Sequence, residues 1–437
     1  MNNAIDYTDL NRTLELLSLG ENVFITGSAG TGKSFLLNKL KEIFKDYITI
    51  TATTGIASQN VHGTTYHLWS GVHVFQYEFP EIIWKCYRKN IVNCNLLAID
   101  EISMMSAFQL EYLDRLFKII RKNNYPFGGI QVIFIGDFFQ LPPVATKEEI
   151  NKYPNKQSFC FESQTWSELN LNPIYLSKIY RQTNLNFSRI LNNFRKGCLT
   201  PEDIETIKSR QISKKLVENK LHIFPLKNQA DNYNKQQLDK ISSQEFYFES
   251  IDKIDKQQIK NGITQETILK KINKNIQAQE IITLKKGCRV MCLRNYSTEN
   301  IYNGSLGTVI DLDEKSVTVR FDKGQISRLR KEFFAYFENE TYMGGRFQIP
   351  LKLAYATTIH KSQGLTLEEA VIDCEDAFAP GQVYVALSRV KSLENLYITG
   401  FNENKVYAAR EAQKFYMNLK QNENTKNRNI YKKLIGT

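Results

Sequence analysis

Long apolar runs are missing from this sequence of 437 residues. No stretch approaches the roughly 20 consecutive apolar residues that a membrane-spanning helix needs. The first residues, MNNAIDYTDL, have neither the basic start nor the apolar run of a secretory signal peptide. We therefore expect a soluble protein of the cytoplasm, associated with the nucleoid if the cell is prokaryotic, with no membrane partner.

Cysteine and histidine are scarce and irregularly placed. The seven cysteines include no pair of Cys-x-x-Cys units, and the five histidines fall at no familiar metal-ligand spacing. A disulfide framework and a structural zinc site are therefore not expected. The net charge of +11 suits a polyanionic partner. The tail 405–437 holds eight lysines and arginines against two glutamates, and a solvated terminal helix is the simpler interpretation of that tail.

Apolar runs alternate with helical patterns along the chain, which is typical of parallel sheets with crossover helices. The length exceeds what one hydrophobic core usually holds, so we expect two α/β domains, at 1–180 and 181–437. The first series of predicted strands lies at 22–26, 48–51, 95–99 and 131–135, and the second at 222–226, 288–293, 351–356 and 396–400. The polar stretch 235–280 has no assignment. At about 304–348, LGTVIDL and SVTVRF alternate with period two, which predicts a small inserted β-barrel.

The most specific motif is the glycine-rich loop GSAGTGKS, which matches GxxxxGK[ST] between a predicted strand and the amphipathic helix KSFLLNKLKEIF. Backbone N–H groups of such a loop surround phosphates, and the helix N-terminus adds partial positive charge. Lys33 is expected to reach the β- and γ-phosphates, and the Ser34 hydroxyl to ligate Mg²⁺. The expected ATP contacts in the loop are Gly27, Ala29, Gly30, Thr31, Gly32, Lys33 and Ser34.

Two further strand ends carry chemistry. The run NLLAI ends in Asp100 and Glu101, where Asp100 is expected to hold Mg²⁺ and Glu101 to polarise the attacking water. The run QVIFI leads into GDFFQLPP, in which the Gln140 amide is placed to sense the γ-phosphate. A tight turn that merely ends the strand is the alternative for this segment.

Two arginines follow at informative places. Arg181 lies in LSKIYRQ, and Arg389 lies in GQVYVALSR, on a predicted helix of the second series. A planar guanidinium at either position could stabilise charge on the γ-phosphate. Each arginine taken alone could equally be a solvated surface residue.

Eight segments together resemble the motif series of the PIF-type (petite integration frequency), RecD-like DNA helicases of superfamily one. In chain order they read GSAGTGKS, TATTGIAS, GTTYHLWSG, LLAIDEISMM, GDFFQLPPV, YRQ, ATTIHKSQGLTL and QVYVALSR. The segment 111–121 is also similar to the signature of that family. The resemblance covers about residues 20–400. It implies two RecA-like P-loop NTPase domains with parallel sheets, an SH3-like β-barrel insertion, ATP and Mg²⁺ as cofactors, and 5′-to-3′ movement on single-stranded DNA with duplex unwinding.

The resemblance also implies further site residues. Gly364 and the residues Gln140, Arg181 and Arg389 complete the expected ATP contacts. The expected DNA contacts are Thr53, Thr54, Thr64, His67, Thr358 and His360. Hydroxyls and backbone N–H groups suit phosphate oxygens, while His67 and Trp69 could stack on bases. Trp69 is equally suited to a hydrophobic core.

The resemblance also implies an aromatic-rich wedge that separates strands at about 62–94, and packing of the aromatic side chains is the alternative for this segment. Forked DNA, G-quadruplexes and DNA–RNA hybrids are implied substrates for a protein active as a monomer. One departure from the family pattern is Asn11 with no glutamine upstream of the P-loop, so selectivity for ATP over other nucleotides is left open.

Two other interpretations remain open. The first is a RecD-like subunit of a nuclease complex, in which another chain would cut the DNA because no nuclease motif is visible here. The second is an ATP-gated nucleic-acid clamp without motor activity. Retention of Lys33, Glu101, Arg181 and Arg389 favours an active motor.

Overall fold

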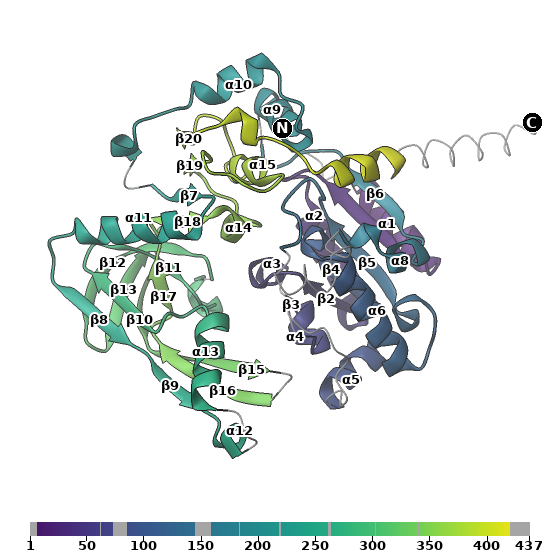
Figure 1. The fold of residues 1–437 in the computed structure, drawn as a ribbon, viewed down its shortest axis with the longest axis horizontal. Helices are drawn as coiled ribbons and strands as arrows, with labels where there is room; N and C mark the ends of the chain where they lie inside the picture. Colours follow the sequence, from purple (N-terminus) through teal and green to yellow (C-terminus); the bar gives the residue numbers. More distant parts are fainter. Residues whose placement is uncertain are drawn as a thin grey trace, which may run out of the picture. The chain divides into compact units, whose positions relative to one another are not determined.

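A computed structural model describes residues 7–61, 63–72, 85–144, 159–182, 184–217, 220–260, 264–301, 303–338 and 341–419. The chain divides into two compact units (Figure 1). The first unit comprises residues 1–212 and 359–437, and the second unit comprises residues 213–358. Residues 73–84 of the expected wedge and 420–437 of the basic tail lie outside the described residues. Within the described part of the chain, no helix has the length and apolar character required to cross a membrane.

The first unit is built on a six-stranded sheet with the order β3-β2-β4-β5-β1-β6. All of its neighbouring strands pair in parallel. The strands are β1 (Val23–Gly27), β2 (Ile48–Ala52), β3 (Thr64–Thr65), β4 (Leu96–Asp100), β5 (Gln131–Gly136) and β6 (Asn172–Leu176). The four apolar runs predicted as the first series are therefore confirmed as β1, β2, β4 and β5.

Helices cover both faces of this sheet, which explains why the strands β1 and β4 are buried along their whole length. In β1, Val23 and Ile25 pack with leucines of α1 and α2. Phe24 belongs to a second hydrophobic cluster, which lies on the other face of the sheet. The helices before residue 212 are α1 (Thr8–Ser18), α2 (Lys33–Phe44), α3 (Gly55–Asn60), α4 (Tyr66–Ser70), α5 (Lys85–Asn93), α6 (Ala107–Arg121), α8 (Gln164–Glu168), α9 (Leu185–Lys196) and α10 (Pro201–Lys208). The 3-10 turns of this region are η1 (Lys45–Tyr47), η2 (Ile102–Met104), η3 (Pro126–Gly129) and η4 (Cys160–Glu162). The helix predicted from KSFLLNKLKEIF coincides with α2.

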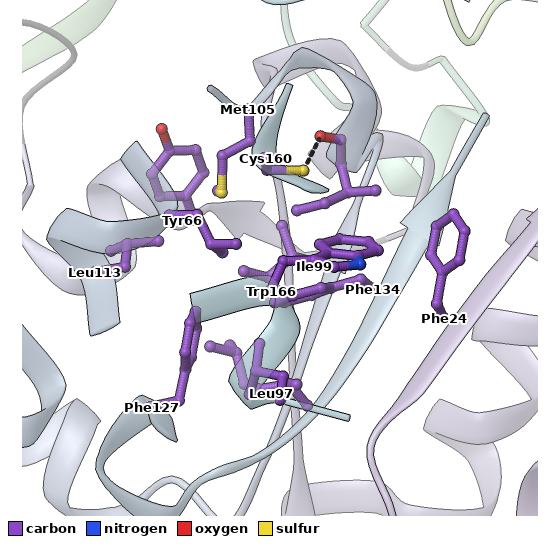
Figure 2. Packing of buried hydrophobic residues seen from close by; sticks show 14 of the residues in the cluster. Phe24, Tyr66, Leu97, Ile99, Met105, Leu113, Phe127, Phe134, Cys160 and Trp166 are labelled. Carbon is purple, nitrogen blue, oxygen red and sulfur yellow. Dashed lines mark hydrogen bonds between the residues drawn. The ribbon is translucent and has the colours of Figure 1, made fainter. Parts of the chain in front are cut away.

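The larger cluster of the first unit is rich in aromatic rings (Figure 2). Phe134 of β5 stacks on Trp166 of α8 with ring centroids 5.5 Å apart, and Phe24 meets Trp166 edge-on at 5.2 Å. Trp69 belongs to the same cluster and packs edge-on against Phe117 of α6. Trp69 is therefore a core residue, and its alternative role as a base-stacking platform is not supported.

The last part of the chain returns to the first unit. Here β19 (Ala370–Asp373) and β20 (Leu396–Gly400) pair in parallel, and the helical elements are α14 (Ile359–Ser362), α15 (Gln382–Leu387), η7 (Glu403–Lys405) and the segment 410–419. The strand predicted at 396–400 is confirmed as β20, while β19 had no sequence prediction. Arg389 was expected on a helix, but α15 ends at Leu387 with Ser388 as its C-cap. The Arg389 Nε donates to the Val385 carbonyl at 2.7 Å, which satisfies a carbonyl that the end of the helix leaves open.

The second unit is mainly antiparallel. Its largest sheet has the order β14-β13-β12-β11-β17, and a second has the order β15-β16-β9. The strands of the unit are β7 (His222–Phe224), β8 (Glu245–Glu249), β9 (Ile251–Ile254), β10 (Ile281–Lys285), β11 (Arg289–Cys292), β12 (Leu306–Asp313), β13 (Ser316–Phe321), β14 (Ile326–Arg330), β15 (Glu332–Glu338), β16 (Thr341–Gln348), β17 (Leu351–Leu353) and β18 (Ala356–Thr358). Its helical elements are η5 (Lys214–Val217), α11 (Lys227–Asp239), α12 (Lys256–Lys260), α13 (Gln265–Asn275) and η6 (Ser297–Glu299).

Part of the second predicted series is wrong. The runs at 288–293 and 351–356 were expected in a parallel sheet, yet β11 pairs antiparallel with both β12 and β17. A short apolar run looks the same in either setting, so the sequence could not distinguish them. The run at 222–226 is confirmed as β7, which pairs in parallel with β18. The predicted hairpin is confirmed as β12 and β13, and the SH3-like barrel stays a prediction.

Candidate functional site

The glycine-rich loop joins the end of β1 to the start of α2, as expected. Gly30 and Gly32 adopt φ angles of +81° and +90°, which residues with a Cβ rarely adopt. A Cβ on Gly30 would also lie 2.5 Å from the Cβ of Arg181. The loop therefore needs glycine both for its conformation and for the close approach of the chain around Arg181.

Lys33 lies at the start of α2 and points its ammonium back into the loop. Its Nζ donates to the Gly27 carbonyl at 2.7 Å and to the Ser28 carbonyl at 3.0 Å. Burial lowers the pKa of Lys33, while the charges of Asp137 and Glu101 raise it. The Lys33 ammonium could exchange these two neutral carbonyl acceptors for phosphate oxygens, because charged oxygens accept stronger hydrogen bonds.

Asp100 and Glu101 stand at the end of β4, beside the loop. Asp100 is buried, and its Oδ1 accepts a hydrogen bond from the Glu101 N–H at 2.8 Å. Burial and the neighbouring Glu101 charge raise the pKa of Asp100, and Lys33 lowers it. A desolvated carboxylate of this kind suits a divalent cation, which would restore a favourable environment for its charge.

The residues present fit a magnesium site that the protein shares with a nucleotide. Among the described residues, no group of three or more His, Cys, Asp and Glu side chains could hold a metal by itself. Mg²⁺ at nucleotide sites commonly takes one or two protein ligands and completes its shell with phosphates and water. Asp100 and the exposed Ser34 hydroxyl supply such a partial set.

The loop 137–140, called the sensor loop after the role expected of Gln140, follows β5. Gln140 is buried, and its backbone N–H donates to the Asp137 carbonyl at 2.9 Å. A Cβ on Gly381 would lie 2.4 Å from the Phe139 carbonyl, so the start of α15 is packed directly on this loop. The segment is a tight turn, and the packing on it also places Gln140 next to the segment that carries Arg389.

Arg181 and Arg389 lie near one another in the first unit. Arg181 Nη1 donates to the Ser388 carbonyl at 3.0 Å, and the Arg181 N–H donates to the Gly30 carbonyl at 3.3 Å. Arg389 is 2% exposed, and burial together with the charge of Arg181 lowers its pKa to about 9. Burial also lowers the pKa of Arg181, and Glu101 favours the charged form of both arginines. Two desolvated guanidinium groups that repel each other form an environment that an anion would stabilise.

Several residues at the site were missed by sequence reasoning. The Tyr384 hydroxyl accepts a hydrogen bond from the Ala29 N–H at 2.7 Å, so a residue of the last motif touches the P-loop directly. Gln182 is buried beside Gly30 and donates to the Val390 carbonyl at 3.3 Å. Gln363 donates from Nε2 to the Glu101 Oε2 at 3.2 Å. A hydroxyl-bearing side chain between two valines of the last motif was the sequence signal that could have indicated Tyr384.

A buried ion pair supports the sensor loop. Arg195 of α9 binds Asp137 with two hydrogen bonds, Nε to Oδ2 at 2.9 Å and Nη2 to Oδ1 at 2.7 Å. The guanidinium also lies over the rings of Phe139 and Tyr416. The Tyr416 hydroxyl is 2.7 Å from the Thr26 Oγ1 and accepts from the Phe138 N–H at 3.2 Å. No sequence pattern predicted this pair, which joins the sensor loop to α9, while the Tyr416 contacts join both to the segment 410–419.

The three expected DNA contacts that are threonines before residue 100 gather at one edge of the sheet. Thr53 and Thr54 follow β2, and Thr64 lies in β3 opposite Thr51 of β2. The Thr53 hydroxyl donates to the Glu101 carbonyl at 2.8 Å, and the Thr54 hydroxyl accepts from the Ala57 N–H at 3.2 Å. These threonines therefore lie at the same sheet edge as Glu101, where open parallel sheets bind ligands.

The remaining expected contacts are aromatic or lie after residue 350. His67 of α4 has its ring 3.8 Å from that of Tyr66, and burial lowers the pKa of His360 in α14. Gly364 follows α14 with a φ of +82°. Thr358 ends β18 and belongs to the second unit, whereas His360 belongs to the first.

Comparisons with known proteins agree on one group of relatives. The family model of the PIF1-like helicases matches residues 11–203. The ATP-dependent DNA helicase Pif1 of Bdellovibrio bacteriovorus is 33% identical over 410 residues, which cover 92% of this chain and 90% of the relative. The ATP-dependent DNA helicase PIF1 of Emericella nidulans is 30% identical over 468 residues. Those residues cover 92% of this chain, but the match spans only 61% of that longer relative.

Solved structures extend the similarity to the fold. The crystal structure of the Pif1 helicase from Candida albicans matches with a TM-score of 0.84 and 32% identity, covering 95% of this chain and all of that chain. The structure of Bacteroides Pif1 bound to single-stranded DNA matches with a TM-score of 0.76 and 29% identity, covering 97% of this chain and 99% of that chain.

Proposed function

Because this chain belongs to the PIF1-like helicase family, we propose that it is an ATP-dependent DNA helicase. It moves 5′ to 3′ on single-stranded DNA and unwinds duplex and forked DNA. Structures of similar proteins include a Pif1 bound to single-stranded DNA, one with ADP-AlF3 and single-stranded DNA, and two Pif1 helicases at forked DNA. The single observation that carries the proposal is that the P-loop, Asp100 with Glu101, and both arginines meet within one unit.

ATP hydrolysis follows from the chemistry of these residues. Lys33 would bind the β- and γ-phosphates, and Mg²⁺, held by Asp100 and Ser34, would neutralise charge on them. Glu101 would polarise a water molecule for attack on the γ-phosphorus, so that the bond to the β,γ-bridging oxygen breaks. The products are ADP and inorganic phosphate, and Glu101 accepts the proton of the water.

Arg181 and Arg389 would stabilise the charge that develops on the γ-phosphoryl group. Their mutual repulsion and their burial favour an anion beside them, such as the γ-phosphate. Gln140 would contact the γ-phosphate and lose that contact after hydrolysis. Gly364 completes the proposed ATP contacts. After hydrolysis, loss of phosphate would allow the protein to leave the conformation that bound ATP stabilises. That conformational change would move the protein one step along the strand.

DNA would be bound mainly through its phosphates. The proposed contacts are Thr53, Thr54, Thr64, His67, Thr358 and His360. Phosphate contacts position a strand without reading its sequence, so binding should depend steeply on salt and little on sequence. We further propose motor domains at 1–180 and 181–437 with an SH3-like insertion at 304–348, a wedge at 62–94, activity as a monomer inside the cell, and G-quadruplexes and DNA–RNA hybrids as additional substrates.

One experiment tests the proposal against its alternatives. ATP hydrolysis is measured with and without single-stranded DNA, together with unwinding of duplexes that carry only a 5′ tail or only a 3′ tail. A helicase of the proposed polarity hydrolyses ATP faster with DNA and unwinds only the duplex with the 5′ tail. DNA-stimulated hydrolysis without unwinding indicates a subunit that needs partners. Nucleotide binding without sustained turnover indicates an ATP-gated clamp.

A further inference from the structure

Glu101 is held by hydrogen bonds from two other segments of the first unit. The Thr53 hydroxyl donates to its backbone carbonyl at 2.8 Å, and the Gln363 amide donates to its side-chain Oε2 at 3.2 Å. Glu101 itself has a φ of +53° and a ψ of 42°, a left-handed conformation that few non-glycine residues adopt. The residue expected to polarise water is therefore restrained at both its backbone and its carboxylate.

Both donors lie in segments that carry expected DNA contacts. Thr53 is half-buried at the sheet edge and is itself one of the expected contacts. Gln363 follows His360 by three residues, and its N–H donates to the His360 carbonyl at 3.4 Å. If DNA binding at His360 moves α14, Gln363 should therefore move with it.

Thr53 has one hydroxyl proton, which imposes a choice between acceptors. The hydroxyl can donate to the Glu101 carbonyl or to a DNA phosphate, but not fully to both. A phosphate oxygen is charged and is the stronger acceptor. DNA at Thr53 would thus remove the hydrogen bond that now fixes the Glu101 backbone.

Gln363 acts on the other end of the same residue. The side chain is 5% exposed, so the amide is fixed by its surroundings and its Oε1 has no hydrogen-bond partner among the described residues. By donating to Oε2, the amide occupies one carboxylate oxygen and determines where the other oxygen points. A glutamate held in this way is a poor partner for water elsewhere in the site.

We propose that Thr53 and Gln363 are positioning residues that restrain Glu101 while DNA is absent, and that DNA binding releases it for hydrolysis. This inference rests on the proposed ATPase and deepens it, because it identifies how the DNA site controls the nucleotide site. Neither residue takes part in the chemical step. Their loss should free Glu101 and weaken the dependence of turnover on DNA.

The first test replaces Gln363 with methionine, which keeps the length of the side chain and removes the donor. Without DNA, turnover by Gln363→Met should rise about tenfold, the effect of one lost hydrogen bond to a charged group. With saturating DNA, turnover should stay within about twofold of wild type, with the KM for ATP unchanged. Gln131→Met is the matched control, because the Gln131 amide donates to the Leu17 carbonyl at 3.0 Å and to the Glu21 carbonyl at 2.8 Å, at the start of β5 and away from the glycine-rich loop.

The second test replaces Thr53 with valine, which removes the hydroxyl and keeps the shape. Thr53→Val should raise the DNA-free rate about threefold, since the lost hydrogen bond is between neutral groups. Thr51→Val is a close control. Its hydroxyl donates to the Ala98 carbonyl of β4 at 2.9 Å, so this variant loses the same kind of hydroxyl-to-carbonyl bond two residues earlier in the chain and away from Glu101.

The ratio of DNA-saturated to DNA-free turnover decides the matter. The proposal is supported if both Gln363→Met and Thr53→Val lower this ratio because their DNA-free turnover is faster. An unchanged ratio overturns it, whether both rates are normal or both are reduced. A decrease confined to the DNA-saturated rate also overturns it, because Gln363 would then promote hydrolysis. Absence of turnover in the wild-type protein under every condition would instead refute the proposed function itself.

Discussion

Removing the Arg195 cation should weaken the first unit more than any ordinary surface substitution. In Arg195→Met the Asp137 carboxylate, which is 0% exposed, loses both of its hydrogen bonds to the guanidinium, at 2.9 Å and 2.7 Å. Burial alone would lower the pKa of Arg195, but Asp137 raises it, so the two charges are strongly coupled. Breaking a buried pair from one side costs about 3–5 kcal/mol, because the Asp137 carboxylate loses its counter-charge and keeps the Phe139 N–H, at 3.2 Å, as a neutral donor.

A double-mutant cycle separates this coupling from simple loss of packing. The variants are Arg195→Met, Asp137→Asn and the two combined. Each single change should lower the free energy of unfolding by about 3 kcal/mol, while the double variant should lose roughly 2 kcal/mol less than the sum, since no uncompensated charge remains. Arg189→Met is the control on the same helix, because Asp203 keeps Asn193 and Thr200 as partners.

Tryptophan fluorescence during urea unfolding measures the free energy of unfolding of the first unit. The chain has three tryptophans, at positions 69, 84 and 166, and none of them falls within residues 213–358 of the second unit. The signal therefore reports on that unit without contribution from the second. Single-variant effects that add within about 0.5 kcal/mol would show that the pair is not coupled and would refute the reasoning.

The other predictions concern the nucleotide and DNA sites. Lys33→Ala should abolish ATP turnover while far-UV circular dichroism stays unchanged, because the ammonium is a charge for phosphates; turnover within about threefold of wild type would contradict the P-loop assignment. Glu101→Gln should bind ATP normally and hydrolyse it slowly in single-turnover measurements, whereas weak binding with normal hydrolysis would reverse its role with that of Asp100. Arg181→Lys and Arg389→Lys should each lower DNA-stimulated turnover by about 10³-fold, since a lysine cannot reproduce the planar fork; near-normal turnover would remove that arginine from the mechanism. The affinity for single-stranded DNA should fall steeply with salt and be similar for unrelated sequences, and titrations with a flat salt response and one preferred sequence would exclude a translocase.

Local chemistry let the sequence determine the nucleotide-binding half of the site. A glycine-rich loop between an apolar run and an amphipathic helix has few structural solutions, so the P-loop, Lys33 and the bounds of α2 could be predicted from neighbouring residues alone. The strands that end in Asp100 and before Gln140 followed from the same logic. In an open parallel sheet the carboxyl ends meet at one edge, which places those residues beside the loop.

Only the tertiary structure decided which distant residues contact these. Arg195 is 58 positions from Asp137, and the Tyr384 hydroxyl binds an N–H group 355 positions earlier in the chain. Thr53 was expected to contact DNA, but its hydroxyl bonds to the Glu101 carbonyl, 48 positions away. Periodicity in a sequence shows which face of an element is apolar, but it contains no record of which polar group will lie opposite.

The same limit applied to the sheets. The runs that became β11 and β17 contain one charged residue each and otherwise resemble the short apolar runs of the parallel sheet, yet they pair antiparallel in the second unit. Strand direction is set by which neighbour the chain can reach and by how the side chains on both faces pack, and these are properties of the assembled unit. The sequence by itself therefore determined the glycine-rich loop and the strand ends beside it, while the tertiary structure decided the pairing of strands and the contacts that hold Asp137 and Glu101 in place.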